Sequence, residues 1–360
     1  MANHSEFHAR HEDLTPRIYN GELTLPHRYV LVLTNICNLK CYFCFQIRDR
    51  RSDAMTADQW ISFIDQMPDY ARVTLTGGEP LAFKEFERVF RHVTRRHQCN
   101  MISNGILLSP KVIDLLLDED NFKVLSISID DIGNHNRDVR PAHWNRFVEA
   151  IKYFHQRKKE LGSKCQLDIK TVVLDKNAHQ LFEIHKYCVE TLKANTHAFQ
   201  FLKGSDLQHA DVMFDMAKIF EPSKAVTYAH IKEIFAEFEA IRRYSANSTC
   251  QAFVHPDICD LNGSTPVEEP EFLNKETIDP GDFQSCKFPW SSVHVNVDGH
   301  LFPCMAVSMG NVKDESLIDI VQGEKFQEFR QALSQKLVQG CNRCGWVRQK
   351  DVRSMTVELT

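Results

Sequence analysis

Segments with the pattern of strands and of helices alternate along the chain from residue 28 to about residue 215. Short β-branched runs such as 72–76 precede segments whose apolar residues recur at helical spacing, as in the helix expected to open at Thr56. The expected strands are 29–33, 72–76, 100–103, 124–129, 167–174 and 197–202, and the helices after the first are 84–96, 109–117, 144–159, 177–192 and 226–243. This alternation predicts an α/β fold, a partial (β/α)6 TIM-like barrel of parallel strands.

Length and composition limit the remaining possibilities. A chain of 360 residues exceeds the usual size of one domain, and its 43% hydrophobic content is enough for a sizeable core. The net charge of −5 without a basic tract argues against nucleic acid as a partner. The polar N-terminus lacks the apolar segment of a signal peptide, and no apolar run is long enough to span a membrane. We therefore expect a cytoplasmic protein without a membrane partner.

The domain boundaries follow from these patterns. Residues 1–27 form an N-terminal extension, 28–245 the barrel, and 284–360 a small domain of a β-hairpin plus a helix. The intervening 246–283, rich in Asn, Ser, Pro and acidic residues, is predicted to be a linker that wraps the surface or edges the active site.

The twelve cysteines fall into two clusters and a scattered set. Thiols stay reduced in the cytosol, so we interpret the clusters by metal-ligand spacing and not as disulfides. The scattered cysteines are Cys99, Cys165, Cys188, Cys250 and Cys259, of which the first three are expected to be buried structural thiols.

The first cluster, Cys37, Cys41 and Cys44, lies on the loop after the first strand. A tetrahedral zinc site needs four ligands, and an iron–sulfur cluster normally has one cysteine per iron. Three close cysteines are therefore either a zinc site that lacks a partner or a cluster with one open iron. Their spacing favours the cluster.

The loop after the second strand has the sequence Gly77, Gly78, Glu79, Pro80. Ligands of parallel βα folds bind at the carboxyl ends of the strands, where paired glycines let the backbone come close to a ligand. A tight turn without a ligand is the alternative reading of the same four residues.

Together these two motifs resemble those of radical S-adenosylmethionine (radical SAM) enzymes, with TNICNLKCYFC as the CxxxCxxC signature and TGGEPL as the GGEP motif. The resemblance implies that the three cysteines hold a [4Fe-4S] cluster whose fourth iron chelates the amino and carboxylate groups of SAM. It also implies that Phe43 adjoins this site and that the GGEP residues bind the methionyl amino group.

Three further segments resemble elements of the same family. They are the turn Ser103-Asn104-Gly105, the strand end from Ser126 to Asp130, and HNRDVRP with Arg140. The resemblance places Ser103 and Asn104 in the SAM site, Ser128 and Asp130 near the ribose or methionine, and Arg140 near the carboxylate. A guanidinium pairs well with a carboxylate, and hydroxyl groups suit ribose. Alternatively, Asp130 caps a loop and Arg140 is a surface charge.

The second cluster comprises Cys286, Cys304, Cys341 and Cys344, built around a predicted hairpin that turns at Asp298-Gly299. Four cysteines can hold zinc or an iron–sulfur cluster equally well. Cys286 to Trp290, the V-x-V-x-x-D-G-x-x-x-P-C hairpin and the closing C-x-x-C resemble the auxiliary-cluster domain called SPASM, or its shorter relative called twitch. No cysteine follows Cys344, whereas a full SPASM domain has more. The resemblance therefore implies one auxiliary [4Fe-4S] cluster with four cysteine ligands.

The implied activity is reductive cleavage of SAM to a 5′-deoxyadenosyl radical, which abstracts a hydrogen atom from a substrate. An electron donor such as flavodoxin or ferredoxin is the implied partner. A fully ligated auxiliary cluster suits electron transfer and favours oxidation of the substrate radical. The sequence identifies no catalytic acid or base.

Three functions remain open. Dehydrogenation of a small molecule such as a sugar or aminocyclitol is favoured by the single auxiliary cluster. Peptide modification, by a thioether or C–C crosslink or by epimerisation with Cys250 or Cys259 as hydrogen donor, is the alternative; against it, 27 residues before the first strand are few for a leader-binding domain. A non-catalytic protein with two structural zinc sites is the third.

Overall fold

A computed structural model describes residues 12–46, 52–132, 141–208 and 211–350 of the protein. Its strands form one curved sheet in the order β10-β9-β8-β1-β2-β3-β4-β5-β6-β7. Neighbouring strands from β1 to β7 are parallel and follow one another in chain order. These strands are β1 (Arg28–Val32), β2 (Arg72–Thr76), β3 (Gln98–Ser103), β4 (Phe122–Ser128), β5 (Gln166–Val173), β6 (Thr196–Phe201) and β7 (Gln251–His255). The predicted partial TIM-like barrel is confirmed.

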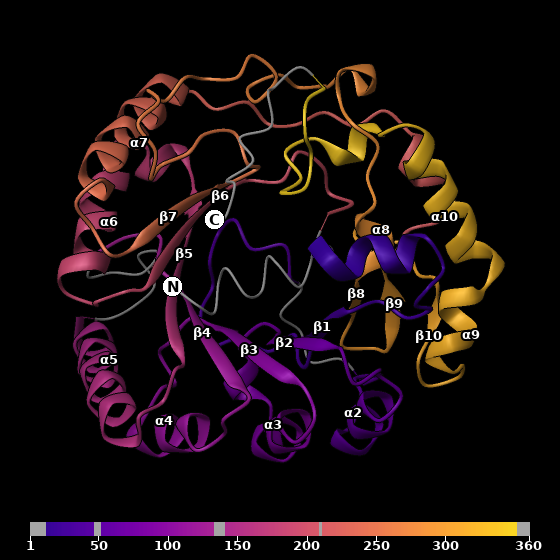
Figure 1. The fold of residues 1–360 in the computed structure, drawn as a ribbon, viewed down its shortest axis with the longest axis horizontal. Coiled ribbons are helices and arrows are strands. Elements are labelled where there is room, and N and C mark those ends of the chain that lie inside the picture. Colours follow the sequence, from indigo (N-terminus) through magenta and orange to yellow (C-terminus); the bar gives the residue numbers. More distant parts are fainter. Residues whose placement is uncertain (1–11, 47–51, 133–140, 209–210, 351–360) are drawn as a thin grey trace.

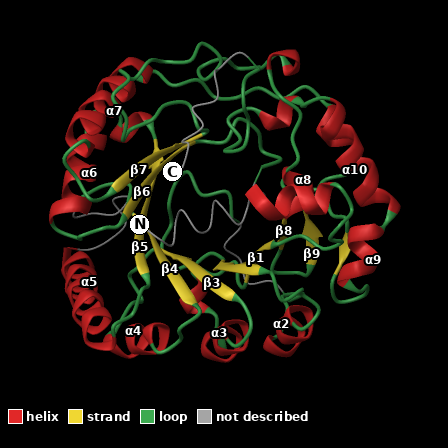
Figure 2. Ribbon diagram, viewed as in Figure 1, coloured by secondary structure: helices red, strands yellow, loops and turns green. Residues whose placement is uncertain are grey.

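The helices that connect these strands lie on the outer side of the curved sheet (Figures 1 and 2). They are α2 (Ala57–Ile64), α3 (Phe86–Thr94), α4 (Pro110–Leu117), α5 (Pro141–Leu161), α6 (Leu181–Glu190) and α7 (Ile231–Ser245). Single 3₁₀ turns are η1 (Pro80–Ala82), η2 (Asp175–Asn177), η3 (Met216–Phe220), η4 (Pro280–Asp282) and η5 (Gln339–Cys341). Thr56 caps α2 as predicted, since its hydroxyl accepts the Gln59 N–H while the Gln59 side chain accepts the Thr56 N–H.

Alternation along the strands separates an apolar outer face from a polar inner one. On β4, Leu125 and Ile127 belong to the buried core beneath the helices. Ser126 and Ser128 therefore point to the inner side of the barrel. Cys99, Cys165 and Cys188 are buried in the same core, as expected of structural thiols.

The segment 246–283 contains more regular structure than the linker predicted there. Its first part forms β7, which pairs in parallel with β6 and adds a seventh strand to the six expected. Ala252 and Val254 of β7 are buried in the core. A segment of five residues between turn-forming residues is too short for its strand periodicity to be recognised in the sequence. The exposed edge of β6 gives this segment its hydrogen-bonding partner.

The C-terminal region continues the same sheet. It contains α8 (Phe288–Ser291), β8 (Ser292–Val295), β9 (His300–Phe302), β10 (Gly310–Asn311), α9 (Leu317–Gln322) and α10 (Glu324–Gln335). The predicted hairpin is β8–β9, with Gly299 at φ +89° in its turn. Strand β8 pairs in parallel with β1, so the hairpin extends the barrel sheet at its first edge. A helix over residues 12–19 lies against this region, where the rings of Tyr19 and Trp290 meet edge to face at 5.0 Å.

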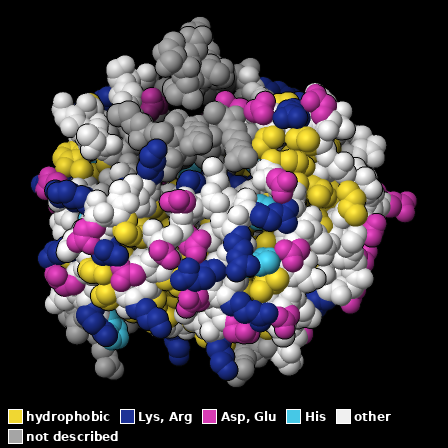
Figure 3. Space-filling model, turned by 60° about the horizontal axis from the view of Figure 1, so that its bottom comes forward, with side chains coloured by type: hydrophobic (Ala, Val, Ile, Leu, Met, Phe, Trp, Pro, Cys, Tyr) yellow, Lys and Arg dark blue, Asp and Glu magenta, His cyan; other side chains and the backbone are white. Residues whose placement is uncertain are grey.

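Acidic and basic side chains are interspersed on the face shown in Figure 3 and do not gather into one basic patch there. Within the described residues, every helix is too short or too polar to cross a bilayer.

Candidate functional site

The three cysteines of the first cluster follow β1 on one loop. Cys37 and Cys41 are half-buried and Cys44 is exposed. The Cys44 N–H donates to the Cys41 carbonyl at 3.1 Å, which closes a turn around Phe43. Burial raises the pKa of Cys37, and the nearby Glu79 and Cys44 raise it further. The loop thus brings thiols near one another at the carboxyl end of β1.

The paired glycines after β2 hold this cysteine loop in place. The Gly78 N–H donates to the Thr34 carbonyl at 2.6 Å, and the Glu79 N–H donates to the Ile36 carbonyl at 2.9 Å. A Cβ atom at Gly77 would lie 2.5 Å from the Thr34 oxygen, and one at Gly78 would lie 2.5 Å from the Ile36 oxygen. The absence of a side chain at both glycines therefore lets the backbone that leads into the cysteine loop pack closely against them.

Glu79 lies at the centre of the site and is completely buried. Its Oε1 accepts the Leu81 N–H at 3.1 Å and the Ser103 hydroxyl at 2.9 Å, and its Oε2 accepts the Asn104 N–H at 2.8 Å. Burial raises the pKa of Glu79 to about 7, although these three donors lower it. The carboxylate therefore joins the GGEP loop to the turn after β3.

The side chain of Asn104 extends this network to the first cluster. Its Nδ2 lies 3.6 Å from the Cys37 sulfur and donates to the Asn38 side-chain oxygen at 2.8 Å. A hydrogen bond to a cluster thiolate is one of the means by which a protein sets a cluster's potential. Glu79, Ser103, Asn104 and Cys37 thus lie in one connected group at the ends of three neighbouring strands.

Phe43 and Pro80 lie at the margins of this group. The Phe43 ring is half-buried and meets the Tyr42 ring edge to face at 5.3 Å. Pro80 is buried at the first position of η1, where its fixed φ suits the turn.

The residues expected near the ribose lie at the end of β4. Ser128 is half-buried on the inner face, and Asp130 is buried. Asp130 Oδ1 accepts the Val172 N–H at 2.6 Å, and its carbonyl accepts from the Asn177 side chain at 3.1 Å. Asp130 therefore ties the end of β4 to β5 and to η2. Arg140 lies outside the described residues.

A polar group on the inner face of β4, β5 and β6 was not predicted. Asp168 accepts the Ser126 hydroxyl at 2.7 Å and the Thr196 hydroxyl at 2.6 Å, and it pairs with the Lys170 ammonium at 3.0 Å. Burial raises the pKa of Asp168, but Lys170 and the two hydroxyls outweigh this effect, so the pKa lies below its usual value. The alternation Leu167-Asp168-Ile169-Lys170 was the available signal, because it puts two charges on one face of a strand.

The second cysteine cluster is assembled at the hairpin edge of the sheet. Cys304 follows β9, Cys341 ends η5, and the Cys344 N–H donates to the Cys341 carbonyl at 3.0 Å. Burial raises the pKa of Cys304 well above its ordinary value, and the thiols of Cys344, Cys286 and Cys341 raise it further. The fold therefore brings all four predicted ligands together. Among the described residues, no three His, Cys, Asp or Glu side chains are arranged to hold a single metal ion.

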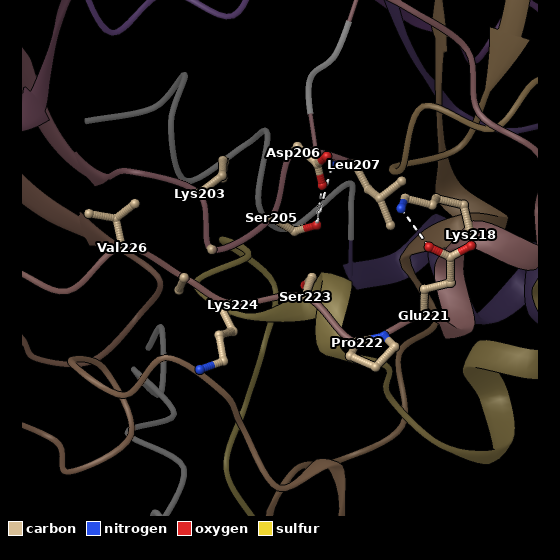
Figure 4. A pocket seen from close by; sticks show the side chains of 12 residues that line it. Lys203, Ser205, Asp206, Leu207, Lys218, Glu221, Pro222, Ser223, Lys224 and Val226 are labelled. Carbon is tan, nitrogen blue, oxygen red and sulfur yellow. Dashed lines mark hydrogen bonds and ion pairs between the residues drawn. The ribbon is translucent and has the colours of Figure 1, made fainter.

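A cavity of about 400 Å³ lies beside this second cluster, between the segments 203–207 and 218–226 (Figure 4). Two of its lysines are paired with carboxylates, Lys218 with Glu221 at 2.5 Å and Lys224 with Glu276 at 2.7 Å. The cavity adjoins the second cluster, because its lining residue Gly204 donates its N–H to the carbonyl of Asn342 at 3.0 Å.

Two family models match this arrangement. The model of the radical SAM superfamily matches residues 31–167, and the SPASM model, an iron-sulfur cluster-binding domain, matches residues 286–345. The chain belongs to the radical SAM superfamily. It carries a C-terminal SPASM domain, and its cofactors are SAM, a SAM-binding [4Fe-4S] cluster and an auxiliary [4Fe-4S] cluster. These matches therefore favour iron–sulfur clusters over the structural zinc sites that the number of cysteines alone allowed.

Individual proteins resemble the radical SAM core and SPASM domain at low identity. The sporulation killing factor maturation protein SkfB of Bacillus subtilis is 24% identical over 303 residues, which cover 82% of this chain and 65% of SkfB. The chain thus spans less than two thirds of the length of SkfB. A crystal structure of Streptococcus suis SuiB bound to S-adenosylmethionine has a TM-score of 0.59 at 18% identity and covers 88% of this chain and 70% of SuiB. The structure of native anSMEcpe with bound AdoMet and Cp18Cys peptide has a TM-score of 0.56 at 17% identity and covers 89% of this chain and 86% of anSMEcpe.

Proposed function

We propose that this radical SAM enzyme removes two electrons from its substrate, with the auxiliary cluster as acceptor of the second electron. In this proposal Cys37, Cys41 and Cys44 hold the SAM-binding cluster. The auxiliary cluster is held by Cys286, Cys304, Cys341 and Cys344. SAM and its cluster, when bound, supply a 5′-deoxyadenosyl radical that abstracts a hydrogen atom from the substrate.

The residues around the first cluster position the cofactor. Glu79 accepts one hydrogen bond each from Ser103 and Asn104, and Asn104 directs its side-chain amide at Cys37. The inner faces of β4 and β5 present Ser128 and Lys170 toward the same end of the barrel, opposite each other in register. We assign Ser128, Asp130 and Arg140 to the ribose and methionine parts of SAM on their match to the family motifs.

One observation supports the proposed two-electron oxidation of the substrate. The four SPASM cysteines lie within electrostatic reach of one another around the half-buried Cys304. A cluster with four thiolate ligands has no open iron for a substrate, so it suits electron transfer. The initial electron for SAM cleavage would come from a small redox protein such as flavodoxin or ferredoxin.

A peptide side chain is the substrate class we propose first. SkfB is a maturation protein, and SuiB was solved bound to the precursor peptide SuiA. A small molecule such as a sugar or aminocyclitol is the second candidate. It is supported by the set Cys286, Cys304, Cys341 and Cys344, whose four thiols suffice for one auxiliary cluster.

Anaerobic reconstitution tests the proposal. About eight irons per chain are expected for two [4Fe-4S] clusters. With dithionite and SAM, the wild type should form 5′-deoxyadenosine, and replacement of Cys37, Cys41 and Cys44 by Ala should abolish it. Unchanged 5′-deoxyadenosine in that variant would refute the assignment of the first cluster.

The oxidation is tested separately with Cys304→Ala. The wild type should convert peptides or aminocyclitols offered as substrates into an oxidised product that is lighter by two hydrogen atoms in mass spectrometry. The Cys304→Ala variant should still form 5′-deoxyadenosine but should not form this oxidised product. A product of unchanged mass that takes up solvent deuterium would indicate epimerisation instead.

A further inference from the structure

Lys203 lies beside the auxiliary-cluster ligands. It follows β6, and its neighbour Gly204 donates its N–H to the carbonyl of Asn342 at 3.0 Å, between Cys341 and Cys344. Burial lowers the pKa of Lys203, and the charge of Cys344 raises it, so the ammonium and this thiol are within electrostatic reach. Within the described part of the chain, no carboxylate forms an ion pair with Lys203, unlike Lys218 and Lys224 of the same cavity.

Arg28 supplies a second cation on the same side. It opens β1 and pairs in register with Ser292 of β8, whose hydroxyl accepts from its guanidinium at 2.9 Å. The guanidinium carbon lies 6.0 Å from the centre of the Phe288 ring, and the Phe288 N–H contacts the Cys286 sulfur at 3.4 Å. Arg28 therefore lies on the strand side, against the ring of the residue whose N–H contacts Cys286, while Lys203 lies on the loop side, next to the segment between Cys341 and Cys344.

The charge state of His294 is consistent with a positive environment there. Strand alternation puts His294 on the same face of β8 as Ser292, and its Nδ1 lies 3.1 Å from the Pro303 carbonyl, next to Cys304. Burial lowers its pKa to about 3, with contributions from Arg28 and Lys203. The histidine is thus neutral and donates to Pro303, and the positive charge of this region belongs to Lys203 and Arg28.

We propose that Lys203 and Arg28 raise the reduction potential of the auxiliary cluster and so make it the electron acceptor for the substrate radical. Four thiolates give the cluster a negative charge that grows by one on reduction. Nearby cations in a buried site stabilise the reduced form more than the oxidised one. This inference rests on the proposed function and on the four cysteine ligands named there.

The electrons balance as follows for a two-electron oxidation. The substrate loses a hydrogen atom to the 5′-deoxyadenosyl radical. The resulting substrate radical loses one electron to the auxiliary cluster and one proton to a base or to water. An oxidised one-electron carrier, a flavodoxin or a ferredoxin, then takes that electron and restores the cluster.

The test is an anaerobic redox titration of the reconstituted holoenzyme, followed by electron paramagnetic resonance. We expect the auxiliary midpoint potential to become more negative in Lys203→Gln and in Arg28→Gln. In the double variant the equilibrium constant for reduction should fall at least tenfold, which is about 59 mV for a one-electron couple. The SAM-binding cluster serves as an internal reference and should keep its potential.

Three matched variants separate charge from structure. Lys203→Arg and Arg28→Lys keep the charges and should keep the wild-type potential. Lys224→Gln removes a lysine of the same cavity that is paired with Glu276, and it should also leave the potential unchanged. Iron and sulfide counts confirm that each variant contains both clusters. If one of the two Gln variants does not hold its clusters, the auxiliary midpoint potential of the other variant tests the inference.

An unchanged auxiliary potential in fully loaded Gln variants would overturn the inference, and so would an equal shift in Lys203→Arg. Its failure is distinguishable from that of the proposed function. If the potential does not move but the wild type forms an oxidised product, the function stands and the inference falls. If the potential moves but all products are redox-neutral, the inference stands and the proposed oxidation falls.

Discussion

The Glu79 carboxylate accepts the backbone N–H of Asn104 at 2.8 Å, and this bond joins the loop after β2 to the turn after β3. The same Asn104 directs its side-chain amide at the Cys37 sulfur. A buried carboxylate thereby orients the group that contacts the first cluster. Glu79 thus positions other residues, which is a role that the GGEP motif does not reveal.

Replacement of Glu79 by Gln should weaken SAM binding at least tenfold, or about 1.4 kcal/mol. A Gln amide has one acceptor oxygen for three donors, so its NH₂ group would face the Asn104 N–H or the Ser103 hydroxyl. SAM binding measured by the change in the spectrum of the reduced cluster tests this. Glu85→Gln, which removes an exposed partner of Arg88, is the control. Equal SAM affinity in both variants would contradict the prediction.

Gly78→Ala should destabilise the protein by about 1 to 3 kcal/mol, the usual cost of overpacking. The added Cβ would lie 2.5 Å from the Ile36 oxygen and 2.7 Å from the Asn35 oxygen, so the cysteine loop must shift. We expect loss of iron from the SAM-binding cluster with the auxiliary cluster retained. Gly345→Ala is the matched control, because its Cβ would meet nothing closer than His255 at 3.7 Å. Full iron content in Gly78→Ala would show that the close approach is not needed.

His185 and His197 form a buried pair between α6 and β6. Their Nδ1 atoms lie 3.0 Å apart, and His197 Nε2 lies 2.8 Å from the Thr171 hydroxyl, which donates to the Ile129 carbonyl. Burial lowers the pKa of His185 to about 4. Burial also lowers the pKa of His197 well below its ordinary value, and the charges of His185 and Lys170 lower it further.

Stability should therefore fall as the pH decreases from about 6.5 toward 4. Unfolded histidines bind protons near pH 6.5 whereas these folded ones do not, so stability is full above 6.5 and is lost below it. Between pH 7 and 5 we expect a loss of about 2 kcal/mol per histidine. Urea unfolding of the metal-free protein at both pH values measures it. The double variant His185→Phe and His197→Phe should flatten this dependence, whereas His92→Phe should not; equal slopes in all three proteins would refute the assignment.

Lys170→Met should uncouple SAM cleavage from substrate oxidation. The ammonium lies on the inner face of the barrel and, among the described residues, forms an ion pair only with Asp168. We expect the yield of oxidised product per 5′-deoxyadenosine to fall at least tenfold, about 1.4 kcal/mol, because the ammonium no longer holds the substrate. Lys152→Met, on the outer face of α5, is the control. An unchanged ratio of the two products would exclude Lys170 from the site.

Much of the fold could be predicted because the strand and helix periodicities are local. The strand 72–76 has the predicted bounds, and Thr56, Ser109 and Ser316 each accept a hydrogen bond at the start of a helix. Strand β7 could not be predicted in the same way. Its five residues become a strand only because β6 offers them an open edge.

The features of the candidate site are likewise of two kinds, those that are local in the sequence and those that depend on the fold. The sequence by itself determined the order of the motifs and is the basis on which the metal ligands are predicted, since the cysteine spacing and GGEP are contiguous in the chain. Only the tertiary structure decided that Gly78 packs on the cysteine loop, that Glu79 holds Asn104, and that Gly204 bonds to Asn342 between Cys341 and Cys344. These contacts join residues far apart in the chain, and the parallel sheet is what brings the carboxyl ends of their strands together.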